Sequence, residues 1–232
     1  MKSNRYNNLY HKCRNKNIHP NHVCEVGVYF PENSNVIDFI RDDIRTSLVE
    51  PSPKCFILLE EYFAAYKNVR IFPYAVYDYN GTLELCESEA STFVSDLKES
   101  PALINDKFDK MKHLKIQVEC RIFSDIDDGS IDLLSVDTEG CEWFVLKNMR
   151  SRPLVISLET HGKLYINPFM IELNRWMDEF GYEPWFIDGS DTVYLKRKAF
   201  KVNNYERFCY SIAKFKIRLR RIRRKLILKL KG

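Results

Sequence analysis

Three carboxylate side chains follow a short apolar run near the middle of the chain. The run is Ile131–Val136, and Asp137, Glu139 and Glu142 come after it. A short, β-prone apolar run of this kind predicts a strand buried on both faces of a parallel sheet. Because open α/β sheets bind their ligands at the carboxyl ends of their strands, we expect chemistry at this position.

A second group of candidate residues follows the first predicted strand, His22–Tyr29. Glu25 and Gly27 close this strand, and Gly27 would let the backbone turn tightly and approach a ligand. Another acid, Glu50, ends the next predicted strand. Its distance from Glu25 in the sequence is close to the ~20-residue spacing at which an acid accepts hydrogen bonds from ribose hydroxyls. This predicts an adenosine-containing cofactor, unless Glu50 is merely a solvated strand end before Pro51.

The loop after Gly27 excludes two common nucleotide-binding motifs. A dinucleotide site requires GxGxxG, but here Tyr29, Phe30, Pro31 and Glu32 follow instead. The sequence also contains no GxxxxGK[ST] motif, which excludes the phosphate loop of NTPases. An acidic loop suits a cofactor that is cationic or zwitterionic at its reactive end, such as S-adenosylmethionine with its sulfonium and ammonium groups.

A positioned side chain can give or take a proton during a reaction, and four side chains near predicted strand ends are candidates for this catalytic role. They are Asp137, Glu139, Glu142 and His161. His161 is the preferred base because an unperturbed imidazole has a pKa of about 6.5. The alternative is that His161 hydrogen bonds to Glu159 or Glu139.

The other candidates also have structural alternatives. Asp137 is the first choice for a direct role because it ends the buried strand, whereas Glu142 can instead stabilise the first turn of the next helix. Oxygen ligands such as Asp137 and Glu159 can bind a hard cation, but no tight ligand spacing supports a metal site, and we expect none.

The predicted elements alternate between strand and helix along most of the chain. Strands are expected at 22–29, 47–50, 69–76, 115–123, 131–137 and 154–159, and helices at 33–45, 53–67, 141–149 and 168–180. A closing antiparallel pair is expected at 182–186 and 192–196, and Asn80-Gly81 suggests another hairpin turn. This alternation predicts a doubly wound, mostly parallel α/β sheet with helices on both faces.

The 232 residues suffice for one α/β domain. We expect a polar, poorly ordered lead-in at 1–20, the domain at 21–200 and a basic tail at 201–232. Seven cysteines without a CxxC pair predict reduced thiols in a cytoplasmic protein. The sequence shows neither the apolar core of a signal peptide nor the ~20 apolar residues of a membrane span, so any membrane contact would be peripheral.

The sequence resembles the FkbM family of S-adenosylmethionine-dependent methyltransferases over about residues 22–196. The motifs that carry the resemblance are DLLSVDTEGCEWFVLKNM (132–149), CEVGVYFPENS (24–34), LVEPSP (48–53), FPYAVYDYNGTLEL (72–85) and VISLETHG (155–162). The resemblance implies a class I methyltransferase (Rossmann-like) fold, whose seven-stranded sheet ends in a reversed strand. It also implies O-methylation, often of sugars or other hydroxylated natural products.

The resemblance also assigns roles to residues at the predicted strand ends. Glu25 and Gly27 correspond to the loop on the methionine side of the cofactor, Glu50 to the acid that binds ribose, and Asp137 to the acid beside the transferable methyl. The full set expected to bind S-adenosyl-L-methionine is Glu25, Gly27, Val28, Tyr29, Ser34, Glu50, Pro51 and Asp137.

The C-terminal tail has the pattern of a basic amphipathic helix. Apolar residues recur at steps of four and three: Phe208, Ile212, Phe215, Leu219, Ile222 and Leu226. From Lys214 onward there are ten Lys or Arg and no acid, and removing these charges from the net charge of +4 leaves residues 1–213 at −6. Residues 208–231 therefore suit an anionic membrane surface. Packing on the body or self-association is the second interpretation, and nucleic acid the third because aromatic residues are scarce after Phe215.

These observations predict a cytoplasmic enzyme, peripheral on the inner face of the membrane, that methylates a hydroxyl of a glycan or lipid-linked sugar. One alternative is an RNA or protein methyltransferase that binds its substrate through the basic tail. Another is a non-catalytic methyltransferase-like interaction module whose Val28–Glu32 loop has lost the cofactor.

Overall fold

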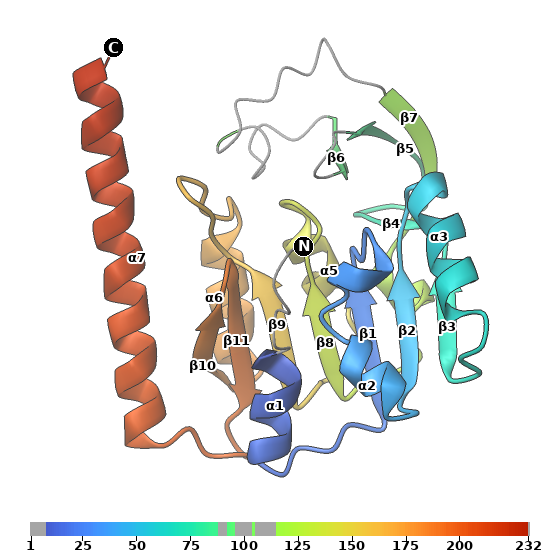
Figure 1. The fold of residues 1–232 in the computed structure, drawn as a ribbon, viewed down its shortest axis with the longest axis horizontal. Coiled ribbons are helices and arrows are strands. Elements are labelled where there is room, and N and C mark those ends of the chain that lie inside the picture. Colours follow the sequence, from blue (N-terminus) through green and yellow to red (C-terminus); the bar gives the residue numbers. More distant parts are fainter. Residues whose placement is uncertain (1–7, 88–91, 96–103, 105–114, 232) are drawn as a thin grey trace.

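A seven-stranded sheet forms the centre of the computed structural model, which describes residues 8–87, 92–95, 104 and 115–231 (Figure 1). The strand order is β10-β11-β9-β8-β1-β2-β3. The strands are β1 (His22–Val26), β2 (Arg45–Val49), β3 (Val69–Phe72), β8 (Leu133–Val136), β9 (Val155–Glu159), β10 (Tyr182–Asp188) and β11 (Asp191–Lys196). All neighbours from β9 to β3 pair in parallel, whereas β11 runs antiparallel to β9 and β10. The predicted mostly parallel sheet with a closing antiparallel pair is confirmed.

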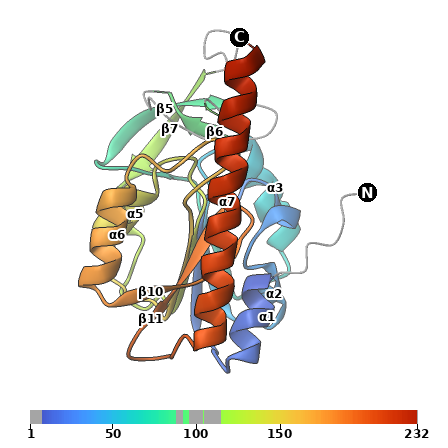
Figure 2. The ribbon, with the colours of Figure 1, turned by 90° about the vertical axis from the view of Figure 1, so that its left-hand side faces the viewer.

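Helices cover both faces of this sheet, as Figure 2 shows. On one face lie α1 (Asn8–Asn15), α2 (Ile37–Arg41) and α3 (Pro53–Phe63), and on the other lie α5 (Glu142–Lys147) and α6 (Met170–Glu179). Adjacent residues of β1 belong to opposite cores: Val23 packs in the cluster of α1–α3, and Cys24 in that of α5 and α6. This alternation follows from the period of two in a β-strand, and it explains why all five residues of β1 are buried.

The N-terminal segment is better ordered than its polar composition predicts. Residues 8–15 form α1, and Leu9, Cys13 and Ile18 are buried in the core between this helix and the sheet. The Tyr10 hydroxyl donates a 2.6 Å hydrogen bond to Asp42. The expectation of a poorly ordered lead-in is therefore wrong for residues 8–20, and residues 1–7 lie outside the described residues.

A second, four-stranded sheet lies beyond the carboxyl ends of the main strands (Figure 1). It has the order β4-β7-β5-β6 and consists of β4 (Ala75–Val76), β5 (Gly81–Glu87), β6 (Thr92–Val94) and β7 (Lys115–Arg121). The predicted strand 69–76 is thus divided between two sheets, and Pro73, which has no N–H to donate, lies at the break.

The Asn80-Gly81 pair is not the turn of a hairpin, because β4 pairs in parallel with β7 and not with β5. The Asn80 side chain instead ties the loop to the segment after β7: its Nδ2 donates to Asp125 at 2.7 Å, and its Oδ1 accepts from the Ile122 N–H at 2.7 Å.

Two further predictions concern helix boundaries. The helix expected at 33–45 is shorter, since 3₁₀ helix η1 (Pro31–Asn33) precedes α2 and Arg45 already belongs to β2. The N-cap of α2 is Val36, and no described side chain caps this helix. The helix expected from Pro53 is confirmed, with this proline in the first turn of α3.

The last element, α7 (Asn204–Lys231), runs beside β10 along the length of the strands (Figures 1 and 2). Its first turn is tied to the body, because Glu206 pairs with Lys16 at 2.8 Å and accepts a 2.7 Å hydrogen bond from the Trp185 indole. Within the described part of the chain, no helix combines the length and the apolar character needed to cross a membrane.

Candidate active site

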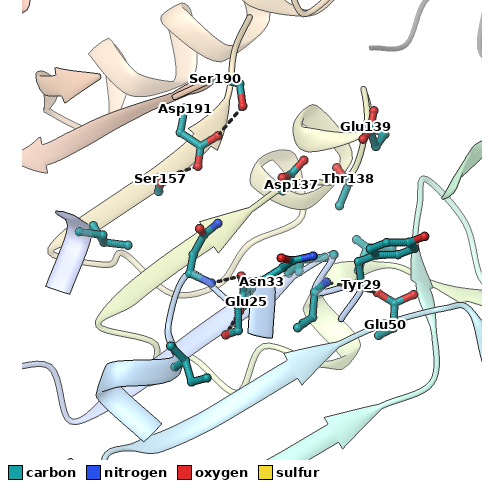
Figure 3. A pocket seen from close by; sticks show the side chains of 18 of the residues that line it. Glu25, Tyr29, Asn33, Glu50, Asp137, Thr138, Glu139, Ser157, Ser190 and Asp191 are labelled. Carbon is teal, nitrogen blue, oxygen red and sulfur yellow. Dashed lines mark hydrogen bonds between the residues drawn. The ribbon is translucent and has the colours of Figure 1, made fainter. Parts of the chain in front are cut away.

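A cavity of about 1150 Å³ lies at the carboxyl ends of β1, β2 and β8 (Figure 3). The cofactor-binding residues expected from the sequence all line it: Glu25, Gly27, Val28, Tyr29, Ser34, Glu50, Pro51 and Asp137. Glu139 lines it as well, whereas His161 and Glu142 do not belong to its lining. The fold therefore gathers the predicted cofactor residues at one place but separates two predicted catalytic residues from it.

Gly27 lies where the end of β1 meets the end of β8. Its φ is +84°, and a Cβ atom built on it would lie 1.9 Å from the Asp137 carbonyl oxygen. The strands hold this position closely, since Gly27 N–H donates to the Val49 carbonyl and Asp137 N–H donates to the Val26 carbonyl, both at 2.9 Å. Only glycine fits both the backbone conformation and the contact.

Glu50 holds the loop that follows Gly27. Its Oε2 accepts hydrogen bonds from the N–H groups of Val28 at 3.2 Å and Tyr29 at 2.7 Å, and its Oε1 accepts from Ser52 N–H at 2.9 Å. Tyr29 has a φ of +61°, a conformation that costs a residue with a side chain about 1–2 kcal/mol. The Glu50 carboxylate stabilises this conformation, and because it is buried, the interpretation as a solvated strand end is wrong.

Glu25 is buried below the same loop. Its carboxyl group accepts a 2.6 Å hydrogen bond from the Ser34 hydroxyl and a 2.8 Å hydrogen bond from the Asn35 N–H. Burial raises the pKa of Glu25 from its ordinary value of 4.5 to about 8, the two hydrogen bonds act against this, and the nearby Asp137 charge adds to it. Ser34 thus orients a carboxyl group of the site.

Glu142 organises the turn after β8 from the protein side. Its Oε1 accepts hydrogen bonds from the N–H and hydroxyl of Thr138, both at 3.1 Å, and from Gly140 N–H at 3.2 Å, and Oε2 accepts from the Asn167 amide. In this turn Glu139 and Gly140 both have positive φ, +55° and +113°. Glu142 is completely buried, and burial raises its pKa to about 7. Its contacts fit a positioning residue, since they fix the backbone beside Asp137.

His161 lies in the loop after β9, outside the cavity lining. Its Nδ1 is 3.0 Å from the Thr160 hydroxyl, so this side-chain hydrogen bond goes to Thr160, and neither to Glu159 nor to Glu139. Burial lowers the pKa of His161, and the charge of Arg221 on α7 lowers it further. The imidazole is thus neutral near pH 7, but it does not face the cavity.

Four polar residues on the far side of Asp137 were not expected from the sequence: Ser157, Asp188, Ser190 and Asp191. Asp191 is buried and accepts hydrogen bonds from the hydroxyls of Ser157 at 3.1 Å and Ser190 at 3.4 Å. Figure 3 shows Asp137 between Asp191 with its two serine partners on one side and Glu50 on the other. The sequence predicts only a connection across Asp188-Gly189 between the two strands of the closing pair. The signal was present, because an acid at the first position of β11 lies beside the carboxyl end of β9.

A second buried carboxyl group, Glu159, is paired in register with Asp191 across β9 and β11. Burial raises the pKa of both groups well above the ordinary carboxyl range, and the charge of Asp137 adds to the shift of each. Burial and the neighbouring negative charges both disfavour the ionised forms of these two groups.

The cavity has a strongly acidic wall and an apolar part. The acids in its lining are Glu25, Glu32, Asp38, Glu50, Asp137, Glu139, Asp188 and Asp191. Arg41 is the one cation among the described lining residues, and it pairs with Asp38 at 2.9 Å. The apolar part of the lining includes Tyr74, Val76 of β4 and Leu85 of β5. Such a wall attracts cationic ligands and repels phosphates.

Within the residues described, no group of three or more His, Cys, Asp and Glu side chains is arranged to hold a metal ion.

Comparison with protein families identifies the family of this chain. A model of the methyltransferase FkbM domain matches residues 25–184, which is more than half of the sequence. The chain belongs to the FkbM methyltransferase family. As an FkbM methyltransferase it takes S-adenosylmethionine as the methyl donor, which agrees with the cofactor expected from the acidic loop. A comparison with curated proteins finds no significant match.

Solved structures similar to this FkbM methyltransferase resemble it only distantly. One described as a caffeoyl-CoA O-methyltransferase from Staphylococcus aureus has a TM-score of 0.47 and 14% identity, and the match covers 84% of this chain and 85% of that one. The methyltransferase domain of bacterial-CtHen1-CN has a TM-score of 0.43 and 11% identity, with 80% and 93% covered. At such scores the likeness carries no conclusion about the substrate.

Proposed function

We propose that this FkbM methyltransferase transfers a methyl group from S-adenosylmethionine to a hydroxyl of a sugar, glycan or glycolipid precursor. The observation that carries the proposal is the cavity whose acidic wall continues past Asp137 into the polar group around Asp191. Carboxylates accept hydrogen bonds in several directions and therefore suit a ligand that presents many hydroxyls. The same wall disfavours an RNA acceptor, because its phosphates would be repelled.

The residues around Gly27 fit the cofactor by their chemistry. The Glu50 carboxylate has lone pairs beyond those that accept from the loop N–H groups, and these accept hydrogen bonds from the ribose hydroxyls. The apolar part at Tyr74 and Val76 suits the adenine ring. Glu25 supports the loop on the methionine side, and Asp137 lies beside the reactive end. When bound, S-adenosylmethionine supplies a methyl group on a positively charged sulfur.

The acceptor side has two tasks, to orient the hydroxyl and to take its proton. Asp137 is the better placed base because it lines the cavity, whereas His161 lies outside the lining. Asp191, oriented by Ser157, holds other hydroxyls of the acceptor in place. Orientation matters because the attacking oxygen must lie in line with the bond that breaks. A positioned base contributes about 10²–10⁴-fold.

Two measurements on the purified chain test this function. The first is binding of S-adenosylhomocysteine by calorimetry, and its absence would favour the non-catalytic interaction module. The second is transfer of an isotope-labelled methyl group to glycan, glycolipid, RNA and protein fractions, followed by mass spectrometry of the products. Label in the RNA or protein fraction alone would contradict the proposed acceptor.

A further inference from the structure

One face of α7 packs against the body. Its half-buried residues recur at steps of three and four along the helix: Glu206, Tyr210, Ala213, Ile217 and Arg221. This face meets the main sheet at β10, and farther along Arg224 donates a 3.3 Å hydrogen bond to the Lys163 carbonyl. The contacts therefore fix which way the remaining faces of the helix point.

The apolar stripe of α7 points away from the body. It consists of Phe208, Ile212, Phe215, Leu219, Ile222 and Leu226, with exposed fractions from 37% to 62%. At 3.6 residues per turn, the centre of this stripe lies roughly 180° around the helix from the half-buried face. The interpretation that the stripe packs on the body is therefore wrong for the described residues.

Basic side chains border the stripe on both sides. At 3.6 residues per turn, one edge of the stripe carries Lys214, Arg218 and Lys225. The other edge carries Lys216, Arg220 and Arg223. Among the residues that the structure describes, none of these six forms an ion pair with a carboxylate. The solvent-facing half of α7 is thus an apolar band between two rows of unneutralised positive charge.

We infer that α7 docks on an anionic membrane surface, with its apolar stripe at the acyl-chain boundary and its basic rows among the lipid headgroups. Both features are needed for such a helix to lie in the membrane plane. Each basic residue near an anionic surface contributes roughly 1 kcal/mol. A nucleic acid partner would use the charges but leave the stripe exposed, and a second copy would bring two sets of positive charges together.

The docked helix would also determine where the acceptor arrives. The C-terminal end of α7 lies at the same end of the molecule as β5, β6 and β7, near the carboxyl edge of the main sheet (Figures 1 and 2). Arg221 lies near His161, and Arg224 contacts Lys163, so α7 adjoins the loop that follows β9. If the proposed function holds, this arrangement favours an acceptor carried by a membrane lipid.

Vesicle co-sedimentation of the full chain tests the docking itself. The vesicles contain phosphatidylcholine with about 30% phosphatidylserine, or phosphatidylcholine alone. The unaltered chain is expected to bind the anionic vesicles, and Phe215→Asp combined with Leu219→Asp should weaken binding at least about tenfold. The matched control is Ile57→Asp on α3, another exposed apolar helix position, which should bind as the unaltered chain does.

Three results would overturn the inference. They are equal binding of the chain and the Phe215/Leu219 variant, no binding to anionic vesicles, and a concentration-dependent dimer that this variant abolishes while vesicle binding is absent. Binding of S-adenosylhomocysteine, measured in parallel, reports on the proposed function alone. A chain that binds this ligand but not vesicles would therefore refute the docking and leave the methyltransferase function intact.

Discussion

Gly27 is the site residue whose backbone geometry leaves the least freedom. Its positive φ and the 1.9 Å approach to the Asp137 carbonyl oxygen act together, so any side chain must displace the end of β8. The sequence alone identified this glycine as a turn residue. It did not reveal that the backbone of Gly27 approaches the Asp137 carbonyl at the end of β8 and not a ligand. This contact joins segments that are far apart in the sequence.

We expect Gly27→Ala to lower the free energy of unfolding by about 2–4 kcal/mol and to abolish binding of S-adenosylhomocysteine. The matched control is Gly129→Ala, where φ is +87° but a Cβ would meet nothing within 4 Å. It should cost only about 1 kcal/mol. Urea denaturation and calorimetry check both variants, and equal destabilisation would show that the contact with Asp137 carries no energy.

The buried carboxyl group of Glu25 predicts a pH dependence of stability. Its pKa is raised from 4.5 to about 8 by burial, so between these values the folded protein binds more protons than the unfolded chain. The contribution of Glu25 to the free energy of unfolding is therefore fully present below about pH 4.5 and declines as the pH rises to about 8.

Urea denaturation at about pH 5 and about pH 8 measures this decline. Glu142 and Glu159 shift in the same direction, so the informative quantity is the difference between the unaltered chain and Glu25→Gln. We expect the variant to lose less stability over this interval because the group at this position no longer titrates. Identical losses would mean that Glu25 is ionised in the folded protein throughout the range.

At the scale of elements, the sequence predicts those strands, helices and turns that depend on neighbouring residues. The apolar strands, the Pro53 helix and the closing hairpin follow from periodicity and turn residues. The second sheet could not be predicted in this way. Its parallel pairing of β4 with β7 joins Ala75 to Cys120, and such a distant pairing produces no pattern in neighbouring residues. The helix α1 was missed because only Leu9 and Cys13 of its eight residues are buried.

The packing of α1 predicts that a segment of polar composition contributes to stability. Leu9 is 4% exposed, and we expect Leu9→Ala to lower the free energy of unfolding by about 2–3 kcal/mol because it leaves a cavity beside the sheet. Ile57 on α3 is 54% exposed, so Ile57→Ala should change stability by less than about 0.5 kcal/mol. Matching urea midpoints for the two variants would show that α1 does not pack as described.

At the scale of the molecule, the parallel order of the sheet explains why the cofactor residues were predictable. The ends of β1, β2 and β8 are neighbours, so Glu25, Glu50 and Asp137 meet although they lie far apart in the sequence. His161 and Asp191 were not predictable in the same way. Asp191 begins β11 and pairs with Glu159 at the end of β9, which brings it to the cavity, whereas the loop after β9 carries His161 outside the lining.

The cavity therefore has a cofactor side at Glu50 and an acceptor side at Asp191, with Asp137 between them. This division predicts that two isosteric variants affect different steps. Asp137→Asn should lower kcat by about 10²–10⁴-fold through loss of a positioned base. Asp191→Asn should mainly raise the KM for the acceptor, because it weakens hydroxyl contacts without touching the reacting oxygen.

Steady-state kinetics with the acceptor identified by product analysis measures both variants, and calorimetry with S-adenosylhomocysteine is the control for cofactor binding. Asp191→Asn should bind this ligand nearly as the unaltered chain does, since Glu50 and the Gly27 loop are unchanged. For Asp137→Asn the same measurement separates a loss of turnover from a loss of cofactor binding. Normal turnover by Asp137→Asn would remove this residue from proton transfer and return the role to another group. If Asp191→Asn instead lowered kcat at unchanged KM, the proton would be taken by Asp191 on the β11 side of the cavity. The roles argued for Asp137 and Asp191 from their positions would then be exchanged.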